Sequence, residues 1–273
     1  MAELVRHDGA RLYFEATGPE DGPLLLLIMG LGLSSRAWDE LPGRLNHRFR
    51  VVVFDNRGVG RSVAPARLFH LPSLADDAAA VLEAVGASQA RPAHVFGISL
   101  GGMIAQELVL RHPHLVARLA LGATNMGWLD SGLPRLGTVI SFLLLITRGP
   151  GLRARRLADL CVSAGFPDRF AEIWERWILR LDHARPTTTL RQLWAALRHS
   201  TRRRLAALKT PTLVITGDDD RIMPPRGSRR IAAVVPGARL VELEGAGHVF
   251  PLERPDETVQ LLTEHFTSEP LLR

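Results

Sequence analysis

A serine flanked by glycines is the residue whose surroundings most clearly suggest chemistry. Ser99 lies in Gly97-Ile98-Ser99-Leu100-Gly101, after a strand-like segment and before a helix-like one. On a sharp turn between a strand and a helix, this G-x-S-x-G pattern raises the serine hydroxyl above a sheet as a nucleophile. Side chains at 97 and 101 would collide with neighbouring backbone in such a turn. The simpler interpretation is a tight turn with an incidental serine, and the flanking strand and helix favour the nucleophile.

A serine nucleophile needs a base to remove its proton and a third group to orient that base. Among ten histidines, His248 is the best candidate because Gly245-Ala-Gly-His248 follows the last strand-like segment. Catalytic groups gather beyond the carboxyl ends of parallel strands. The carboxylates Asp218 to Asp220 follow another such segment. A solvated acidic turn is the simpler interpretation for two of the three. A metal site there is disfavoured because three successive side chains cannot all point one way.

The elements that must position these residues follow an alternating pattern. Short apolar segments alternate with helix-like segments, which predicts an α/β fold with a doubly wound, mostly parallel sheet. A hairpin over residues 3–17 precedes them. Strand candidates begin at residues 23, 49, 93, 119, 212 and 239, and helix candidates span 35–47, 73–85, 101–112, 227–235 and 255–266. In the second helix, Ser73 to Asp76 has the pattern of a capping box, and Gly86 follows as a helix stop.

The alternation breaks between residues 126 and 208, where no buried strand is evident. We expect residues 126–208 to form a helical cap, inserted between strands six and seven of an α/β core made of residues 1–125 and 209–273. Two helical faces in this segment are apolar, with arginines on the opposite side. They comprise Ile173, Trp174, Trp177, Ile178 and Leu181 on the first helix, and Leu190, Leu193, Trp194 and Leu197 on the second.

Composition places the chain among globular proteins. It has 273 residues, of which 46% are hydrophobic and 23% charged, so disorder is excluded. The single cysteine, Cys161, excludes a disulfide framework and a zinc-finger ligand set. The longest apolar runs are far shorter than the roughly 18 residues that a bilayer requires. The first residues lack the order of a secretory signal. We therefore expect a cytoplasmic protein without a transmembrane segment.

The basic character of the chain belongs to one segment. The net charge is only +6, and the isoelectric point near 10.9 reflects an excess of arginine with a single lysine and a single tyrosine. Residues 148–204 hold 13 arginines and 5 acidic residues, a balance of +8 that leaves −2 for the remainder. A solvated outer face of the cap is the simpler interpretation, ahead of an anionic partner. Nucleic acid is not an expected partner because no recognition motif is present.

Taken together, these residues resemble the α/β-hydrolase superfamily, in its serine esterase and lipase-like branch, over nearly the whole chain. Ser99, Asp220 and His248 occur in the superfamily's order of nucleophile, acid and base, and Asp220 occupies the fourth position of its G-x-x-D motif. The matching segments are Met29-Gly-Leu-Gly32, Asp55-Asn-Arg-Gly-Val-Gly-Arg-Ser62, Gly97 to Gly101, Gly217 to Pro224 and Gly247-His248.

The resemblance also implies further site residues. It implies an oxyanion hole made by the backbone amides of Leu31 and Leu100, although Met29 replaces the histidine usual before that glycine. The Met-Gly-Leu-Gly variant is similar to that of anthracycline methyl-ester hydrolases. The resemblance implies structural roles for Asp55, Arg57 and Ser62. We expect no cofactor and no metal. The residues expected to bind substrate are Gly30, Trp38, Met126, Phe142, Trp174, Trp177, Met223 and Val249, although packing between cap helices is the simpler interpretation for any single aromatic residue of the cap.

The expected function is hydrolysis of small to medium, apolar carboxylic esters through an acyl-enzyme on Ser99. A serine at this position argues against the superfamily branches that use aspartate, the haloalkane dehalogenases and epoxide hydrolases. The same residues would serve a lactonase, a thioesterase, a C–C bond hydrolase or a cofactor-free perhydrolase. Outside catalysis, a ligand receptor of the same fold is the alternative. The expected partner is a small-molecule ester, and the sequence does not predict an oligomeric state.

Overall fold

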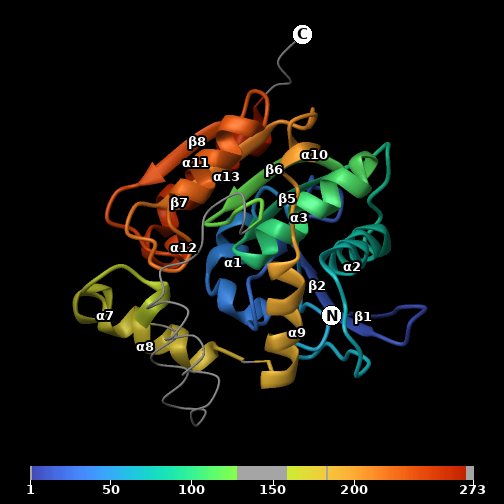
Figure 1. Ribbon diagram of the computed structural model, residues 1–273, viewed down its shortest axis with the longest axis horizontal. Coiled ribbons are helices and arrows are strands. Elements are labelled where there is room, and N and C mark those ends of the chain that lie inside the picture. The colour runs from blue at the N-terminus through green and yellow to red at the C-terminus, as the bar shows by residue number, and fades with distance from the viewer. Residues whose placement is uncertain (1, 128–158, 183, 269–273) are drawn as a thin grey trace.

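An eight-stranded sheet organises the protein, seen in a computed structural model that describes residues 2–127, 159–182 and 184–268 (Figure 1). The strand order is β1-β2-β4-β3-β5-β6-β7-β8. The strands are β1 (Ala2–Val5), β2 (Arg11–Thr17), β3 (Leu24–Ile28), β4 (Arg50–Phe54), β5 (Ala93–Ile98), β6 (Val116–Gly122), β7 (Thr212–Gly217) and β8 (Arg239–Leu243). Strands β3 to β8 run parallel, and the β1–β2 hairpin joins β4 in antiparallel fashion. The predicted fold class is confirmed.

Helices cover both faces of the sheet, which explains why central strands such as β3 and β7 are buried along their whole length. All five residues of β3 are buried, and they alternate between two hydrophobic clusters. The cluster on one face includes residues of α2 (Leu71–Ala84), α3 (Leu100–Arg111) and α11 (Arg226–Val234). The cluster on the other includes residues of α1 (Leu41–Leu45), α12 (Phe250–Glu253) and α13 (Pro255–Thr267).

Two details of the predicted helices are wrong. The expected helix over 35–47 is a 3-10 turn, η1 (Ser35–Trp38), followed by the short α1, because Asp39 adopts a φ of 51° that a helix does not allow. Helix α2 begins at Leu71 with His70 as its N-cap, so Ser73 does not cap it. Gly86, with a φ of 90°, follows the end of α2 as expected.

Between β6 and β7 the described residues form helices. These are α7 (Phe166–Arg169), α8 (Ala171–Arg180), α9 (Pro186–Leu197) and α10 (Arg202–Leu205). A separate 3-10 turn, η2 (Pro113–Leu115), connects α3 to β6. The described part of the expected cap is thus helical. Its extent over 126–208 stays a prediction. In the described residues, no helix combines the length and the apolar composition needed to span a bilayer.

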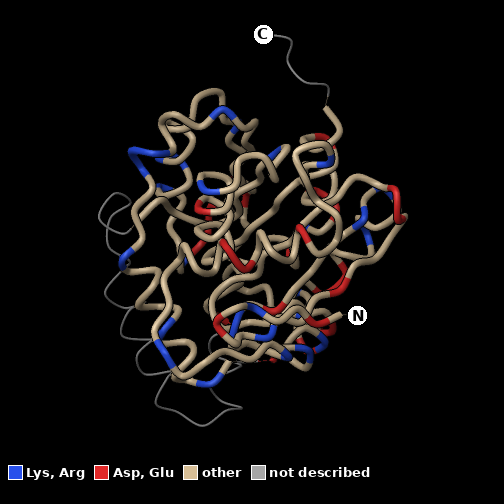
Figure 2. Tube along the Cα trace, turned by 90° about the vertical axis from the view of Figure 1, so that its right-hand side faces the viewer, with Lys and Arg blue, Asp and Glu red and all other residues tan. Residues whose placement is uncertain are grey.

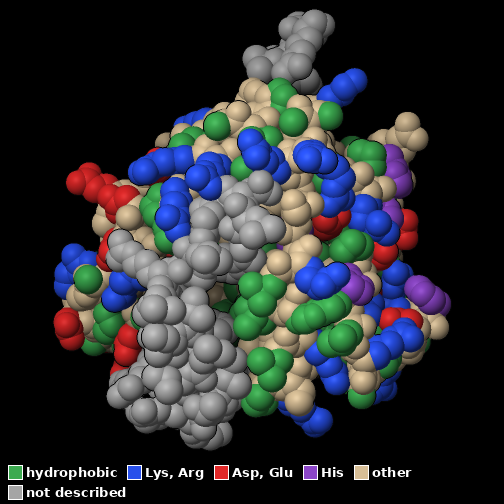
Figure 3. All heavy atoms as spheres, viewed as in Figure 1, with side chains coloured by type: hydrophobic (Ala, Val, Ile, Leu, Met, Phe, Trp, Pro, Cys, Tyr) green, Lys and Arg blue, Asp and Glu red, His purple; other side chains and the backbone are tan. Residues whose placement is uncertain are grey.

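The predicted apolar face of α9 is wrong. Leu190 and Leu197 are 46% and 58% exposed, and hydrophobic side chains are visible over this helix in Figure 3. The residues of α9 that are buried instead are Thr188, Gln192, Ala195 and Ala196. The helix therefore turns its small and polar side inward: Ala195 and Ala196 join the core cluster that contains α3, and Gln192 bonds the backbone of the loop after β3.

The arginines of α8 also differ from expectation. Arg180 and Arg176 both form ion pairs with the carboxylate of Asp39, at 2.7 and 3.2 Å. They therefore attach α8 to the loop after η1 rather than forming only a solvated outer face. Trp174 and Trp177, on the predicted apolar face of α8, are buried. Along the left-hand edge of the molecule in Figure 2, basic segments predominate.

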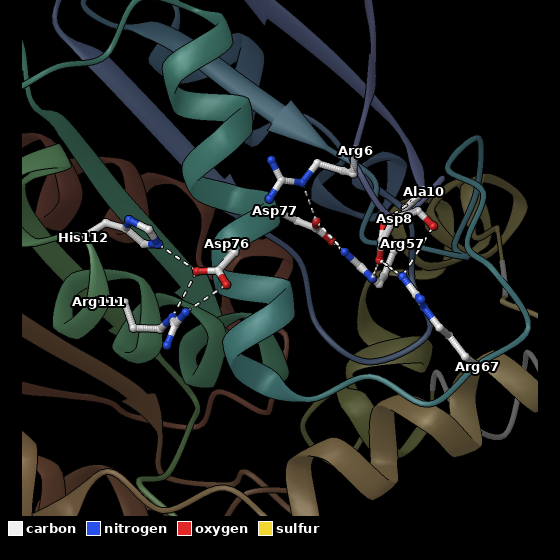
Figure 4. Close-up of polar contacts among 9 residues, drawn as sticks. All are labelled: Arg6, Asp8, Ala10, Arg57, Arg67, Asp76, Asp77, Arg111 and His112. Atoms are coloured by element: carbon white, nitrogen blue, oxygen red, sulfur yellow. Dashed lines mark hydrogen bonds and ion pairs between the residues drawn. The ribbon is translucent and has the colours of Figure 1, made fainter.

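A buried ion network joins the N-terminal hairpin to the loop after β4 and to helix α2. Arg57 donates to Asp77 of α2 and to Asp8 of the hairpin turn, and Arg6 and Arg67 extend the chain of contacts (Figure 4). Nearby, Asp55 accepts hydrogen bonds from Ser35 and Arg61, and Ser62 donates to the carbonyl of Asp55. These contacts hold the loop after β4, which agrees with the structural roles expected for Asp55, Arg57 and Ser62.

Candidate active site

Ser99 lies on a strained turn between β5 and α3. Its φ of 59° and ψ of −122° are rare for a residue with a side chain. The turn needs glycine on both sides, because a Cβ on Gly97 would strike the carbonyl of Gly101, and one on Gly101 would strike the carbonyl of Ile28. The strain is concentrated at the residue expected to do chemistry, at the N-terminus of a 12-residue helix.

Contacts with the end of β6 fix the backbone of Ser99. Its N–H donates to the carbonyl of Gly122 at 2.9 Å, and its carbonyl accepts from the hydroxyl of Thr124 at 2.7 Å. Ser99 as a whole is 8% exposed. Neighbouring residues thus stabilise the strained backbone of Ser99 through both its N–H and its carbonyl. These two contacts do not use the side-chain hydroxyl.

His248 and Asp220 are paired beyond the carboxyl ends of β8 and β7. His248 Nδ1 lies 2.7 Å from Asp220 Oδ2, and both side chains are buried. The other oxygen of Asp220, Oδ1, accepts the backbone N–H groups of Ile222 at 2.9 Å and Met223 at 2.7 Å. Both carboxylate oxygens therefore have partners, and the carboxylate holds the imidazole by one nitrogen, with Nε2 as the nitrogen left for proton transfer.

The loop that carries His248 also packs back toward the strand that carries Ser99. Phe250, two residues after His248, lies with its ring 6.4 Å from that of Phe96 in β5. Its ring also lies close to Gly122, whose carbonyl accepts the Ser99 N–H. These contacts join the loops of Ser99 and His248, and the N–H of Asp219, which donates to the carbonyl of Ala246 at 3.0 Å, joins the loop of Asp220 to that of His248. The three residues of the expected triad thus follow the carboxyl ends of β5, β7 and β8, at the same edge of the sheet.

A strap over residues 161–164 ties the loops of Asp220 and His248 together. The carbonyl of Cys161 accepts from the N–H of Val249 at 2.8 Å, and the N–H of Ala164 donates to Asp219 at 2.8 Å. Between them, Arg221 donates to the carbonyl of Val162. One short segment thus hydrogen-bonds the residues next to Asp220 and the residue next to His248.

Glu253 is a buried acid that contacts this strap through Ser163. Its carboxylate accepts the N–H of Gly247 at 2.8 Å, the N–H of Ser163 at 3.0 Å and the Ser163 hydroxyl. Burial raises the pKa of Glu253 above its ordinary value, against these hydrogen bonds. The sequence analysis missed Glu253. The one available signal was an acid five residues after the proposed base.

The loop after β3 lies directly against Ser99. A Cβ built on Gly30 would be 3.2 Å from the Cβ and 3.7 Å from the hydroxyl oxygen of Ser99. Leu31 is the next residue, and Leu100 is the first residue of α3, where backbone N–H groups have no acceptor within the helix. The two residues whose amides are expected to form the oxyanion hole therefore belong to two different elements that meet at Ser99, and that role stays a prediction.

The other residues expected to bind substrate lie in three places. Trp38 packs in the core, 5.3 Å from the Phe96 ring. Trp174 and Trp177 lie 5.9 Å apart in a cluster with Leu252, and the Trp177 indole donates to the carbonyl of Ala37. Met126 and Met223 belong to the core cluster that contains α3, Val249 packs against the tryptophan cluster, and Phe142 lies outside the described residues. Substrate binding stays a prediction for all eight.

The described residues contain no group of three or more His, Cys, Asp or Glu side chains placed to hold a metal ion. Burial raises the pKa of the Cys161 thiol to about 12, so this cysteine stays protonated near neutral pH. It does not compete with Ser99 as a nucleophile.

Comparison with known proteins places this arrangement in a family. The sequence profile of the "Alpha/beta hydrolase family" matches residues 25–261. The chain belongs to the alpha/beta hydrolase family. The expected superfamily and the expected class, an enzyme of the hydrolase type, are confirmed.

Several known proteins are similar to this alpha/beta hydrolase over most of their length. "Putative carbamate hydrolase RutD" from Azorhizobium caulinodans is 31% identical over 261 residues, which are 94% of this chain and 95% of RutD. "Rhodomycin D methylesterase DauP" from Streptomyces sp. strain C5 is 33% identical, covering 91% and 92% of the two chains. The crystal structure of a hydrolase from Pseudomonas aeruginosa PA01 superposes with a TM-score of 0.86 at 28% identity, covering 98% of each chain.

Proposed function

We propose that this protein is a serine hydrolase that cleaves carboxylic esters through an acyl-enzyme on Ser99. One observation carries the proposal: a buried Asp220–His248 pair lies beyond the same edge of the sheet as a serine on a strained turn. In this proposal His248 is the base for the Ser99 hydroxyl, and Asp220 orients that base.

In the proposed reaction, Ser99 Oγ attacks the ester carbonyl while His248 accepts the hydroxyl proton. Asp220 holds the imidazole in the required tautomer and stabilises its charged form. The amides of Leu31 and Leu100 donate to the oxyanion, each contributing about 3 kcal/mol of transition-state stabilisation. His248 then protonates the departing alcohol, and water attacks the acyl-enzyme in the second half of the reaction to release the acid and free Ser99.

The proposed substrates are small to medium, apolar esters. The aromatic cluster of Trp174 and Trp177 beside Val249 supports an apolar acyl or alcohol group. The similarity to a methylesterase favours a small alcohol, and the similarity to a putative carbamate hydrolase makes carbamates a second candidate class. A carbamate carbonyl is open to the same attack by Ser99. A cytoplasmic location stays a prediction.

A fluorophosphonate probe and p-nitrophenyl esters test the proposal. We expect the probe to label the wild type covalently and Ser99→Ala not at all, with much slower labelling of His248→Ala. Ser88→Ala, a variant in a distant turn, is the matched control and should label like the wild type. Labelling that persists in Ser99→Ala would place the nucleophile elsewhere.

Turnover separates the candidate classes. The turnover of p-nitrophenyl esters of increasing chain length is compared with that of matched N-methyl carbamates. We expect short esters to be hydrolysed faster than long esters and faster than the carbamates. Probe labelling with turnover of neither class would point instead to a ligand receptor, and faster turnover of carbamates would replace the ester assignment.

A further inference from the structure

The loop that lies against Ser99 is held from outside the sheet, by residues far away in the sequence. Gln192 of α9 accepts the N–H of Gly32 on its side-chain oxygen at 2.8 Å, and the N–H of Ala184 donates to the carbonyl of Gly32 at 2.8 Å. Both hydrogen-bonding groups of Gly32 are therefore used by the segment between α8 and the middle of α9. Gly32 is itself buried, with a φ of 70°.

The amide of Gln192 is not explained by packing. Its side chain is fully buried, and its Nε2 has no hydrogen-bond partner among the described residues. A buried amide nitrogen without a partner opposes folding, and an apolar side chain of the same length would avoid this cost. The residues that share its buried face, Thr188, Ala195 and Ala196, are small. What the glutamine supplies, and an apolar residue would not, is the oxygen that accepts from Gly32.

That hydrogen bond acts close to the proposed oxyanion hole. The peptide group held by Gln192 joins Leu31 to Gly32, and the preceding peptide group carries the Leu31 N–H. Gly30, one residue earlier, lies against Ser99. The hydrogen bonds to the N–H and the C=O of Gly32 fix the two peptide planes on either side of its Cα. Because successive peptide planes are linked only through φ and ψ, this limits the rotation of the preceding plane, which carries the Leu31 N–H.

We propose that Gln192 is a positioning residue that holds the Leu31 amide toward the oxyanion formed when Ser99 attacks. This inference rests on the proposed function. The oxyanion exists only after the attack, so a misplaced donor weakens binding of the transition state more than binding of the substrate. Loss of the Gln192 oxygen should therefore lower kcat and leave KM nearly unchanged.

Gln192→Met tests the proposal because it keeps the length of the side chain and removes the acceptor. We expect kcat for a p-nitrophenyl ester to fall by about 10- to 100-fold, a fraction of the loss seen when an oxyanion donor is removed outright, with KM within about twofold. A trifluoromethyl ketone, which forms an oxyanion on the serine, should lose affinity in parallel with kcat. Gln192→Leu repeats the test with a second apolar side chain.

Stability distinguishes positioning from a structural role. Gln192→Met loses one hydrogen bond and one unpartnered nitrogen, so its melting temperature should stay within about 4 °C of the wild type. Thr188→Val is the matched control, since Thr188 is buried one turn earlier on α9 and contacts the Gly58 loop instead. It should keep kcat, KM and ketone affinity.

The outcomes separate this inference from the proposed function. If the wild type neither hydrolyses esters nor reacts with the fluorophosphonate, the proposed function fails and this inference fails with it. If the wild type is active and Gln192→Met keeps its kcat and its ketone affinity, only the role of Gln192 is overturned. A rise in KM alone, or loss of the fold in both Gln192 variants, would overturn it as well.

Discussion

Two buried aspartates at different places in the molecule have opposite kinds of partner. Asp77 of α2 accepts from the guanidinium groups of Arg57, with one contact at 2.6 Å, and of Arg6 at 3.2 Å (Figure 4). Asp220 accepts two backbone N–H groups on one oxygen and lies against an imidazole on the other. Both aspartate side chains are almost fully inaccessible to solvent, at 1% and 0%. Burial alone therefore does not distinguish a structural acid from a candidate catalytic one.

The partner makes the difference. A guanidinium keeps its charge at every pH at which the protein is folded, so the Asp77 network cannot pass a proton and contributes only to stability. An imidazole gains and loses a proton near neutral pH, so a fixed carboxylate beside it can favour the charged state that a reaction creates. We therefore expect variants in the first region to affect folding and variants in the second to affect rate.

The largest expected effect is on catalysis. Asp220→Asn keeps the size of the side chain but removes the charge and offers His248 the wrong hydrogen-bonding pattern, so kcat should fall by about 10⁴-fold. Steady-state hydrolysis of a p-nitrophenyl ester measures this, with circular dichroism to verify the fold. Asp218→Asn is the matched control in the same loop, because its oxygen still accepts the Gly245 N–H, and it should stay near wild-type activity. Equal losses in both variants would contradict the role of Asp220.

The second effect should fall on stability. Asp77→Ala leaves Arg57 buried with only Asp8 as an acidic partner, which should cost about 3 to 5 kcal/mol of unfolding free energy. Urea denaturation measures the loss, and kcat per folded molecule should not change. Asp76→Ala is the control, since that neighbouring acid pairs with the more exposed Arg111 and should cost only about 1 kcal/mol. A large loss of kcat in folded Asp77→Ala would undo the comparison.

A third acid extends the contrast to pH dependence. Burial raises the pKa of Glu107 in α3, but the His199 imidazole 3.5 Å away and two hydrogen bonds from Arg204 outweigh it and lower the pKa to about 2. A lowered pKa in the folded state means that the ionised acid stabilises the protein above its unfolded pKa of 4.5, and that this contribution disappears as the pH falls toward 2.

Glu107→Gln should therefore lower the unfolding free energy by about 2 kcal/mol at pH 6, less than the full shift implies because the Arg204 side chain is half exposed. Urea midpoints measured from pH 6 down to pH 2.5 should converge for the two proteins. Glu83→Gln, an exposed acid on α2, provides the control with no pH-dependent difference. A constant gap between wild type and Glu107→Gln across this range would contradict the assignment.

The parts of this comparison differ in how far sequence predicts them. The elbow at Ser99 and the positions of Asp220 and His248 follow from local patterns, because short apolar strands and their terminal turns are encoded by neighbouring residues. The buried side of α9 does not follow. Leu190 and Leu197 are exposed and Gln192 is buried, because the surface that α9 meets includes the polar backbone of a loop 160 residues away. Contacts of this range leave no periodic signal in the sequence.

Glu253 shows the same limit and provides the smallest expected effect. Its partners are neutral donors, Gly247 next to the proposed base and Ser163 of the strap, 90 residues away. The N–H groups of Gly247 and Ser163 donate hydrogen bonds to Glu253, and these bonds are expected to position the loop that carries His248. In Glu253→Gln, one carboxylate oxygen becomes an NH₂ donor that faces the Ser163 N–H. We therefore expect kcat to fall by up to about tenfold. Glu257→Gln, exposed on α13, is the matched control.

The same substitution should leave KM nearly unchanged, because glutamine keeps the shape of the side chain and the oxygen that accepts from Gly247, and it should lower the unfolding free energy by about 1 to 3 kcal/mol because the Ser163 N–H loses its acceptor. Removing the Ser163 hydroxyl as well tests whether Glu253 and Ser163 act together. In Glu253→Gln with Ser163→Ala, the loss of kcat should be smaller than the product of the single losses, since either change alone already breaks the contact. Independent, multiplicative losses would show that the strap does not transmit position to His248 through this pair.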